Sequence, residues 1–277
     1  MDTARFFEGV PALFPGDPQD TDPLDSYWDV VKKDVSGYTS SNELAVLNHA
    51  AQLMPESEAY LEVGTFKGRS LCGAVRDAAD KKFYAMENFM EFGMAGQEAR
   101  TELMRNLGVY GADSDVELLE GDCFKLMVQP GAIDRPVGVY FYDGEHTLLS
   151  HYLALAVVEP LLADEALVLV DDATWPVVQR AHRLFMKRHP GWTIEATWDA
   201  READDPRWAN GLHALVFRRT KPSRLSRSDE SLRRYQTTVQ DRVNAVAWKA
   251  ADAMPGVVKA GAKVLLSRSR AIGSGDR

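Results

Sequence analysis

The sequence contains very few cysteines. Its 277 residues include two, Cys72 and Cys123, which is too few for a disulfide framework. No apolar run approaches the length needed to span a membrane, and the first five residues, Met1 to Arg5, do not begin a signal peptide. These absences argue against a disulfide-stapled secreted protein and against helical membrane spans. We therefore expect a protein of the reducing cytoplasm.

Positive charge is scarce over most of the chain. The net charge is −9, yet Arg218 to Arg277 contain 14 Lys or Arg against 5 Asp or Glu, so residues 1–217 carry −18. Nucleic-acid binding needs a basic footprint, and we expect no nucleic-acid substrate. The basic segment places Val239, Val243 and Val246 at helical spacing. Such an apolar stripe needs a partner surface, and we expect self-association into a homodimer or larger homo-oligomer.

The composition is that of a globular α/β protein with added terminal segments. Hydrophobic residues make up 45% and charged residues 26%, both ordinary values. We divide the chain into an N-terminal arm with helices (residues 1–55), a central domain (residues 56–220) and a basic, partly helical extension (residues 221–277). Within the arm, residues 1–25 are rich in Pro, Gly and Asp and are predicted to be irregular.

Strands and helices alternate along the central domain. Short apolar runs predict strands, and apolar residues at helical spacing predict helices. The predicted strands cover residues 59–63, 82–86, 116–119, 137–142, 166–170, 193–198 and 212–217, and the predicted helices cover residues 26–35, 40–53, 97–107, 148–162 and 176–188, with one more beginning near residue 69. This alternation predicts a doubly wound, mainly parallel sheet whose last two strands form an antiparallel pair.

Three carboxylates follow two of the buried strands. A run ending at Tyr142 leads into Asp143 and, three residues later, His146, and a second run leads into Asp171 and Asp172. Ligands of open α/β sheets bind outside the carboxyl ends of the strands. Buried acids in a cluster repel one another unless a cation lies among them. Oxygen ligands of this kind favour Mg²⁺, Mn²⁺ or Ca²⁺ over zinc.

A second group of residues predicts a cofactor pocket. The first strand turns at Gly64 and Gly68, where glycine permits positive φ and close approach of a ligand. The fingerprint G-x-G-x-x-G is absent, which argues against NAD. Glu87 ends the next strand and is placed to bind two ribose hydroxyls, and Asp122, after the third, could accept a hydrogen bond from an adenine amino group. Each feature alone is common, but their order is not.

With these residues in this order, residues 40–218 resemble a class I S-adenosylmethionine-dependent methyltransferase. The resemblance implies the seven-stranded, Rossmann-like methyltransferase fold and S-adenosyl-L-methionine as the cofactor. It implies that the two glycines pack against the methionine part, that Glu87 binds the ribose and that Asp122 lies at the adenine edge. The residues that it assigns to the cofactor are Glu62, Gly64, Thr65, Gly68, Ser70, Glu87 and Asp122. One departure is that many members have a third glycine in the turn.

The acids narrow the resemblance further. Asp171 and Asp172 follow Asp143 by 28 residues, and with His146 they resemble the metal-dependent sugar O-methyltransferases of the macrocin and mycinamicin type. This resemblance implies that Asp143, Asp171 and Asp172 hold Mg²⁺ or another divalent cation and that His146 is the general base beside Asp143. It also implies a saccharide or glycoside acceptor, such as a mannoside or rhamnoside.

Three alternatives remain open from the sequence. Catechol-type O-methyltransferases are similar but carry Asp-Asn where this chain has Asp171 and Asp172, so a catechol-like phenol is a second possible acceptor. His146 could instead cap a helix or bind a carboxylate, and Asp172 could orient a water ligand of the cation. A non-catalytic protein that binds the cofactor as a scaffold is the third alternative.

Overall fold

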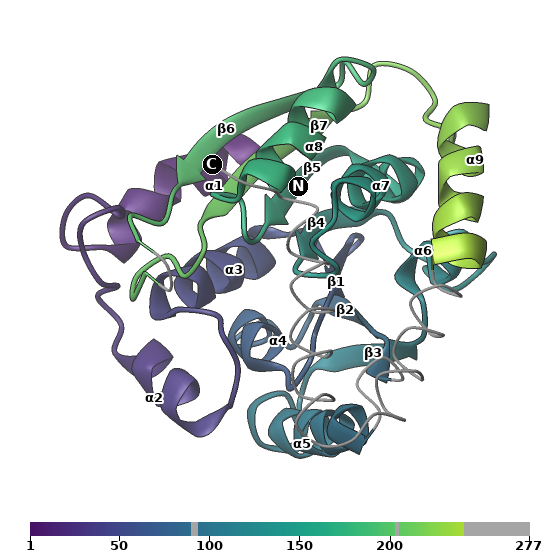
Figure 1. The fold of residues 1–277 in the computed structure, drawn as a ribbon. Coiled ribbons are helices and arrows are strands. Elements are labelled where there is room, and N and C mark those ends of the chain that lie inside the picture. Colours follow the sequence, from purple (N-terminus) through teal and green to yellow (C-terminus); the bar gives the residue numbers. More distant parts are fainter. Residues whose placement is uncertain (90–93, 203–204, 241–277) are drawn as a thin grey trace, which may run out of the picture.

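The computed structural model describes residues 1–89, 94–202 and 205–240. One seven-stranded sheet with the order β3-β2-β1-β4-β5-β7-β6 organises the chain (Figure 1). The strands are β1 (Ala59–Val63), β2 (Lys82–Glu87), β3 (Asp115–Glu120), β4 (Val137–Tyr142), β5 (Leu162–Val170), β6 (Trp192–Trp198) and β7 (Leu212–Arg218). The α-helices are α1 (Thr3–Gly9), α2 (Tyr27–Asp34), α3 (Ser41–Leu53), α4 (Arg69–Ala74), α5 (Met94–Tyr110), α6 (Cys123–Leu126), α7 (Leu148–Val158), α8 (Pro176–Met186) and α9 (Arg227–Tyr235).

The sheet confirms the predicted fold class. Strands β1 to β5 pair in parallel, whereas β7 runs antiparallel to both β5 and β6. Every residue of β1 and β4 is buried, because helices cover both faces of the sheet. The continuous apolar run before Asp143 is thus explained by a central strand that meets a hydrophobic layer on each side.

Each face of the sheet has its own hydrophobic core. One core joins the sheet to α6, α7 and α8, and the other joins it to α1, α3, α4 and α5 (Figure 1). The helix α3 begins with a capping box, in which Ser40 and Glu43 exchange hydrogen bonds between side chain and backbone. This cap fixes the start of α3 beside the carboxyl ends of the strands.

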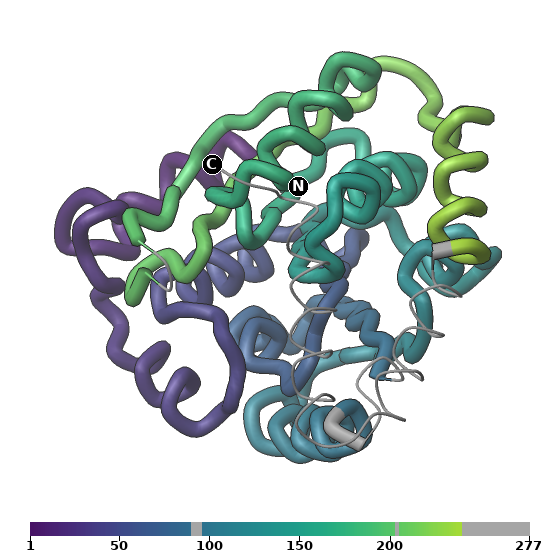
Figure 2. The backbone as a smooth tube through the Cα atoms, in the orientation of Figure 1, coloured from purple at the N-terminus to yellow at the C-terminus, as the bar shows by residue number. Residues whose placement is uncertain are grey.

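The prediction that residues 1–25 are irregular is wrong for the first half. Helix α1 forms there because the Asp2 side chain accepts a hydrogen bond from the Arg5 N–H and because Phe6 is fully buried. A short 3₁₀ helix, η1 (Val10–Leu13), follows. The next residues lie beside the β6–β7 connection, where the Pro18 carbonyl accepts a hydrogen bond from Trp208 Nε1 at 3.0 Å (Figure 2).

The helix predicted for residues 148–162 ends earlier than expected. Helix α7 stops at Val158, Glu159–Leu161 form the 3₁₀ helix η3, and β5 already begins at Leu162. Pro160 has no N–H to continue the α-helical ladder, which accounts for the early end. At the other end of the chain, α9 leads into a π-helical turn, η4 (Gln236–Gln240).

The apolar stripe predicted in the extension is only partly described by the structure. Val239 is 45% exposed, whereas Val243 and Val246 lie outside the described residues.

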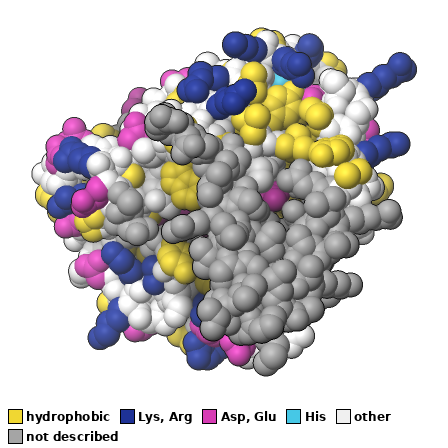
Figure 3. Space-filling model, in the orientation of Figure 1, with side chains coloured by type: hydrophobic (Ala, Val, Ile, Leu, Met, Phe, Trp, Pro, Cys, Tyr) yellow, Lys and Arg dark blue, Asp and Glu magenta, His cyan; other side chains and the backbone are white. Residues whose placement is uncertain are grey.

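In the space-filling view, hydrophobic side chains gather over α7 and α8, with Lys and Arg side chains around them (Figure 3). Of the helices in the described ranges, none has the length and apolar composition needed to cross a bilayer.

Candidate active site

The glycine turn after β1 has the backbone that the sequence predicts. Gly64 and Gly68 adopt φ values of +92° and +85°, which side chains with a Cβ rarely tolerate. A Cβ on Gly64 would lie 1.8 Å from the carbonyl oxygen of Asp143. The turn therefore lies directly against the loop that follows β4, and the two strand ends share one edge of the sheet.

Glu87 anchors this turn from the end of β2. Its Oε2 accepts a hydrogen bond from the Phe66 N–H at 2.6 Å, and its Oε1 accepts one from the Asn88 N–H at 2.7 Å. Phe66 itself has a φ of +48°, so the carboxylate holds a backbone conformation that is unusual for a non-glycine residue. The predicted ribose-binding residue thus also shapes the pocket.

A pocket opens at the carboxyl ends of β1 to β4. It is lined by Val63, Gly64, Met86, Glu87, Asn88, Gly121, Asp122, Cys123, Phe124, Tyr142, Gly144, Glu145 and Gln236. Of the residues predicted to bind the cofactor, Gly64, Glu87 and Asp122 are brought together in its wall. Glu62, Thr65, Gly68 and Ser70 are not among the lining residues.

Glu62 and Ser70 instead form a hydrogen bond that joins the two elements on either side of the turn, β1 and α4. Glu62 is fully buried on β1 and accepts hydrogen bonds from Ser70 Oγ at 2.8 Å and from the Tyr60 hydroxyl at 3.2 Å. Burial raises the pKa of Glu62 to about 7, although both hydrogen bonds favour its charged form. The carboxyl thus connects β1 to the start of α4, below the pocket.

Asp122 forms the beginning of α6. Its Oδ1 accepts a hydrogen bond from the Phe124 N–H at 2.8 Å, as the N-cap of this short helix. Its Oδ2 lies 3.1 Å from Lys125 Nζ. The residue lines the pocket where the sequence places the adenine edge, and its Oδ2 is buried without a hydrogen-bond partner.

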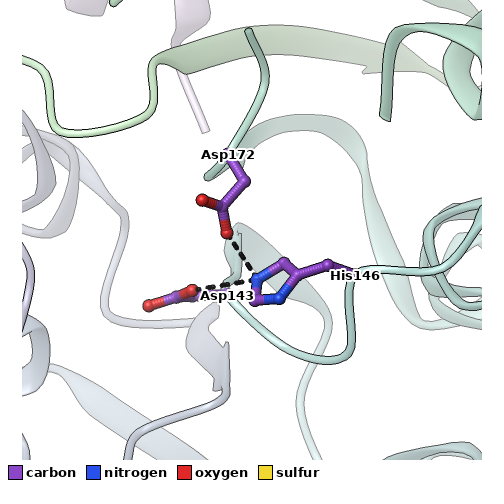
Figure 4. A group of neighbouring side chains, drawn as sticks. All are labelled: Asp143, His146 and Asp172. Carbon is purple, nitrogen blue, oxygen red and sulfur yellow. Dashed lines mark ion pairs between the residues drawn. The ribbon is translucent and has the colours of Figure 1, made fainter. Parts of the chain in front are cut away.

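A carboxylate–histidine group lies next to this pocket. Potential ligand atoms of Asp143, His146 and Asp172 all lie within 4.8 Å of one another. His146 Nε2 is 3.8 Å from Asp143 Oδ1 and forms a shorter ion pair with Asp172 Oδ2 (Figure 4). In the close-up the imidazole ring points between the two carboxylates. The ends of β4 and β5 therefore converge as the sequence predicts.

Asp171, the third predicted metal ligand, lies beside this group without belonging to it. Its Oδ1 accepts a hydrogen bond from the Asp172 N–H at 2.8 Å. Burial and the carboxylate of Glu43 raise the pKa of Asp171 well above its usual range. Glu43 comes from the capping box of α3, and its Oε1 is buried without a hydrogen-bond partner. The acidic cluster is thus larger than the three residues that the sequence suggests.

The loop that carries Asp172 is held by the β6–β7 connection. Asp172 has a φ of +54°, and its Oδ1 accepts a hydrogen bond from Asn210 Nδ2 at 2.7 Å. Backbone hydrogen bonds from the Ala173 and Thr174 N–H groups to the carbonyls of Gly211 and Asn210 hold the same loop. Asn210 therefore orients one of the predicted ligands.

The electrostatics of the group depend on its acids. Burial raises the pKa of Asp143 to about 6, against the hydrogen bond that His146 donates. For His146, burial would lower the pKa, but the hydrogen bonds and charges of Asp143 and Asp172 outweigh it and raise the pKa to about 10. An imidazole in this arrangement is protonated at neutral pH and takes the place of a cation among the carboxylates.

This donor set fits a hard divalent cation. Two carboxylates from adjacent strand ends converge, and further buried acids lie behind them, so positive charge would relieve their mutual repulsion. Asp143 and Asp172 would hold such an ion, and it would replace the imidazolium as their counter-charge. The described structure thus offers a candidate cation site immediately beside the pocket at the strand ends.

Three residues of this region were not found by sequence reasoning. Glu43 follows Ser40 by three residues, a spacing that indicates a helix cap alone, and Asn210 carries no signal beyond that of a turn. Gln236 lies in the segment expected to mediate self-association, yet it is 2% exposed and lines the pocket. A sequence pattern reveals local structure, whereas these three residues reach the site through contacts between distant segments.

Comparisons with known proteins agree with this architecture. A family model described as a methyltransferase domain matches residues 61–173. None of the curated proteins matches the sequence. Similar solved structures include an O-methyltransferase from Bacillus cereus in complex with SAH, at 15% identity and a TM-score of 0.53, with 71% of this chain and 92% of that chain covered.

Two other structures show the same degree of likeness. The O-methyltransferase TomG from Streptomyces achromogenes, involved in tomaymycin synthesis and solved with SAM, is 15% identical with a TM-score of 0.52, covering 79% of this chain and 100% of that chain. A protein from Staphylococcus aureus assigned as a caffeoyl-CoA O-methyltransferase is 17% identical with a TM-score of 0.52, covering 70% and 93%. At these identities the likeness concerns the fold.

The fold, the pocket and the family match lead to one conclusion. The sheet order, the glycine turn with Glu87 opposite it, and the matched domain over residues 61–173 occur together in one chain. The chain has the fold of the class I S-adenosylmethionine-dependent methyltransferases, and its residues 61–173 match a methyltransferase domain.

Proposed function

We propose that this protein transfers the methyl group of S-adenosylmethionine to a hydroxyl oxygen of a small-molecule acceptor and needs a divalent cation to do so. One observation carries this proposal. The loop from Asp143 to His146 borders both candidate sites, because Gly144 and Glu145 line the pocket while Asp143 and His146 belong to the candidate cation site. An acceptor held at the cation site would therefore lie next to the cofactor.

The residues of the site have distinct tasks in this reaction. Asp143 and Asp172 would hold the cation, and a bound cation lowers the pKa of a hydroxyl in contact with it. Asn210 keeps Asp172 in position. His146, once the cation replaces it as the partner of the carboxylates, can accept the hydroxyl proton at Nε2. Alignment of oxygen and methyl group supplies much of the remaining rate.

We propose an acceptor with two adjacent hydroxyl groups, of the catechol-like phenol class. The structural neighbours support this class, since one of them is assigned as a caffeoyl-CoA O-methyltransferase. A phenol also needs little help, because its pKa is about 10, as for tyrosine. The half-buried His146 can then accept the proton of the phenol hydroxyl.

A sugar hydroxyl is the second candidate acceptor. Asp172 stands where the catechol-type enzymes carry Asn, and His146 provides a base that a less acidic hydroxyl would need. Both features come from the resemblance to macrocin- and mycinamicin-type enzymes. We keep it as the alternative because the structural neighbours favour the phenol.

The experiment measures SAH formation with two matched panels of acceptors, catechol-like phenols and rhamnosides or mannosides. We expect turnover with the phenols, its loss in EDTA and its return with Mg²⁺. Asp143→Asn should abolish turnover, whereas the exposed control Asp113→Asn should not change it. Turnover with glycosides alone would select the second candidate. Full turnover in a thoroughly chelated sample would contradict the cation requirement.

A further inference from the structure

One wall of the cofactor pocket comes from the end of the described chain. Gln236, the first residue of η4, lines the pocket together with Asp122, Phe124 and Glu145. It lies outside the matched domain region, residues 61–173, so the family match predicts nothing about it. The role of this wall therefore has to be inferred from its own contacts.

Helix α9 is fixed against the loop that begins α6. Arg233 Nη1 donates a hydrogen bond to the Phe124 carbonyl at 3.1 Å, and the Tyr152 hydroxyl donates one to Asp229 Oδ1 at 2.9 Å. In Figure 1 the helix stands beside α6 and α7. These contacts place Gln236 at the end of the pocket formed by the residues after β3, which is the expected adenine end.

The Gln236 side chain presents one unused hydrogen-bond acceptor. Its Nε2 donates to Glu145 Oε2 at 2.8 Å, which leaves Oε1 facing away from that carboxylate. Oε1 is buried and has no hydrogen-bond partner. A buried acceptor without a partner is unfavourable, so it is expected to find a donor when the pocket is filled. The turn that starts at Gln236 is π-helical, a type of turn that is frequent at functional sites.

The chemistry of the cofactor limits what that donor can be. Its hydrogen-bond donors are the ribose hydroxyls, which Glu87 is placed to bind, the methionine ammonium, which the glycine turn at Gly64 would face, and the adenine amino group. The residue predicted for the adenine, Asp122, already engages the Phe124 N–H and lies at Lys125. Asp122 Oδ2 and Gln236 Oε1 are both buried at this end without a hydrogen-bond partner, and of the two only Gln236 Oε1 is neutral and lies outside an ion pair.

We propose that Gln236 Oε1 accepts a hydrogen bond from the amino group of the cofactor adenine, so that the C-terminal helix takes part in cofactor recognition. The inference rests on S-adenosylmethionine as the methyl donor, as the proposed function does. It does not depend on the acceptor or on the cation.

The test measures binding of S-adenosylhomocysteine by calorimetry, without acceptor and without metal. Gln236→Met keeps the length of the side chain but removes both polar atoms, and it should weaken binding about tenfold, the usual effect of losing one hydrogen bond. The control is Thr238→Ala, an exposed residue two positions further on in the same turn, which should bind as the wild type does. Circular dichroism verifies that both variants are folded.

A second ligand separates recognition from simple packing. S-inosylhomocysteine carries an oxygen acceptor in place of the amino donor, so the wild type should bind it at least tenfold more weakly than S-adenosylhomocysteine. This preference should shrink to near unity in Gln236→Met. Equal affinity of the wild type for both ligands, or an equal loss for both in the variant, would overturn the proposal. Failure of the wild type to bind S-adenosylhomocysteine at all would instead contradict the cofactor assignment itself.

Discussion

At the scale of single residues, His146 can be a base or a partner of the carboxylates. As the base, His146→Gln should lower turnover about 10²–10⁴-fold, because a positioned proton acceptor contributes that much. Affinity for Mg²⁺, measured by calorimetry, should hardly change, since Asp143 and Asp172 remain. The exposed Asp113→Asn is again the control. A loss of Mg²⁺ binding in His146→Gln would show that the imidazole is itself a ligand.

Asn210 is not a predicted metal ligand, but it holds the side chain of one, Asp172. Removing its hydrogen bond to Asp172 Oδ1 in Asn210→Ala frees a side chain whose backbone has a φ of +54°. We expect Mg²⁺ affinity to fall about 10–100-fold, the typical cost of losing a group that orients a metal ligand. Titration calorimetry with Mg²⁺ alone measures this, and cofactor affinity should stay as in the wild type. Unchanged Mg²⁺ affinity would mean that Asp172 needs no such support.

Glu62 makes stability depend on pH. Burial raises its pKa to about 7 in the folded protein, so the folded state retains a proton that the unfolded chain loses near pH 4.5. This contribution is fully present below about pH 4.5 and is lost as the pH rises through about 7. Glu62→Gln cannot ionise, so its free energy of unfolding relative to wild type should rise by up to about 3 kcal/mol between pH 4.5 and 8.

Chemical denaturation at several pH values measures this difference. Ser70→Ala removes the hydroxyl that donates a hydrogen bond to Glu62. Since that hydrogen bond favours the charged carboxyl, the fall of stability with pH should occur at a higher pH in this variant than in the wild type. Parallel stability curves for wild type and Glu62→Gln would show that Glu62 keeps its usual pKa.

At the scale of elements, the turn between β1 and α4 depends on one glycine. In Gly64→Ala, a φ of +92° is strained, and the new Cβ would lie 1.8 Å from the Asp143 carbonyl oxygen. Because that neighbour is backbone, the ends of β1 and β4 must separate. We expect the free energy of unfolding to fall by several kcal/mol. If the variant still folds, we expect it to lose SAH binding.

Gly108 supplies the matched control for this prediction. It lies inside α5, and a Cβ there would meet nothing within 4 Å. Gly108→Ala should stabilise the protein by about 0.5–1 kcal/mol, because alanine favours a helix interior. Thermal melting compares the two variants. Equal effects of both substitutions would show that the turn tolerates a side chain.

At the scale of the whole molecule, the C-terminal extension has two parts with different roles. Residues up to Gln240 include the pocket wall, whereas self-association was predicted from a stripe that continues into residues 241–277, outside the described residues. A chain ending at Gln240 should therefore keep its SAH affinity. If the stripe joins two copies, the mass measured by light scattering should fall to that of one chain.

A second truncation separates these roles. Ending the chain at Leu225 removes α9 and Gln236 as well, and SAH binding should then weaken by more than the loss of Gln236 alone, because the Arg233 contact to Phe124 is lost too. An unchanged mass after removal of residues 241–277 would rule out the stripe as the joining surface.

Strand patterns and turn residues were enough to predict the sheet and the edge at which its polar residues meet. Apolar runs long enough for strands, followed directly by Asp143, Asp171 or Glu87, correctly predict parallel strands whose polar ends meet at one edge. The glycines at 64 and 68 also take the positive φ that was expected. These features are local, because strand periodicity, turn conformation and capping depend on neighbouring residues.

The side chains that complete the candidate site come from distant segments of the chain. Asp172 meets Asn210 across 38 residues, and Glu145 meets Gln236 across 91, so no spacing in the sequence could pair them. The early end of α7 and the helix at Thr3–Gly9 depended on Pro160 and on a buried Phe6. Burial of apolar surface stabilises contacts between residues whatever their separation in the sequence. The site therefore contains residues that its sequence motifs do not include.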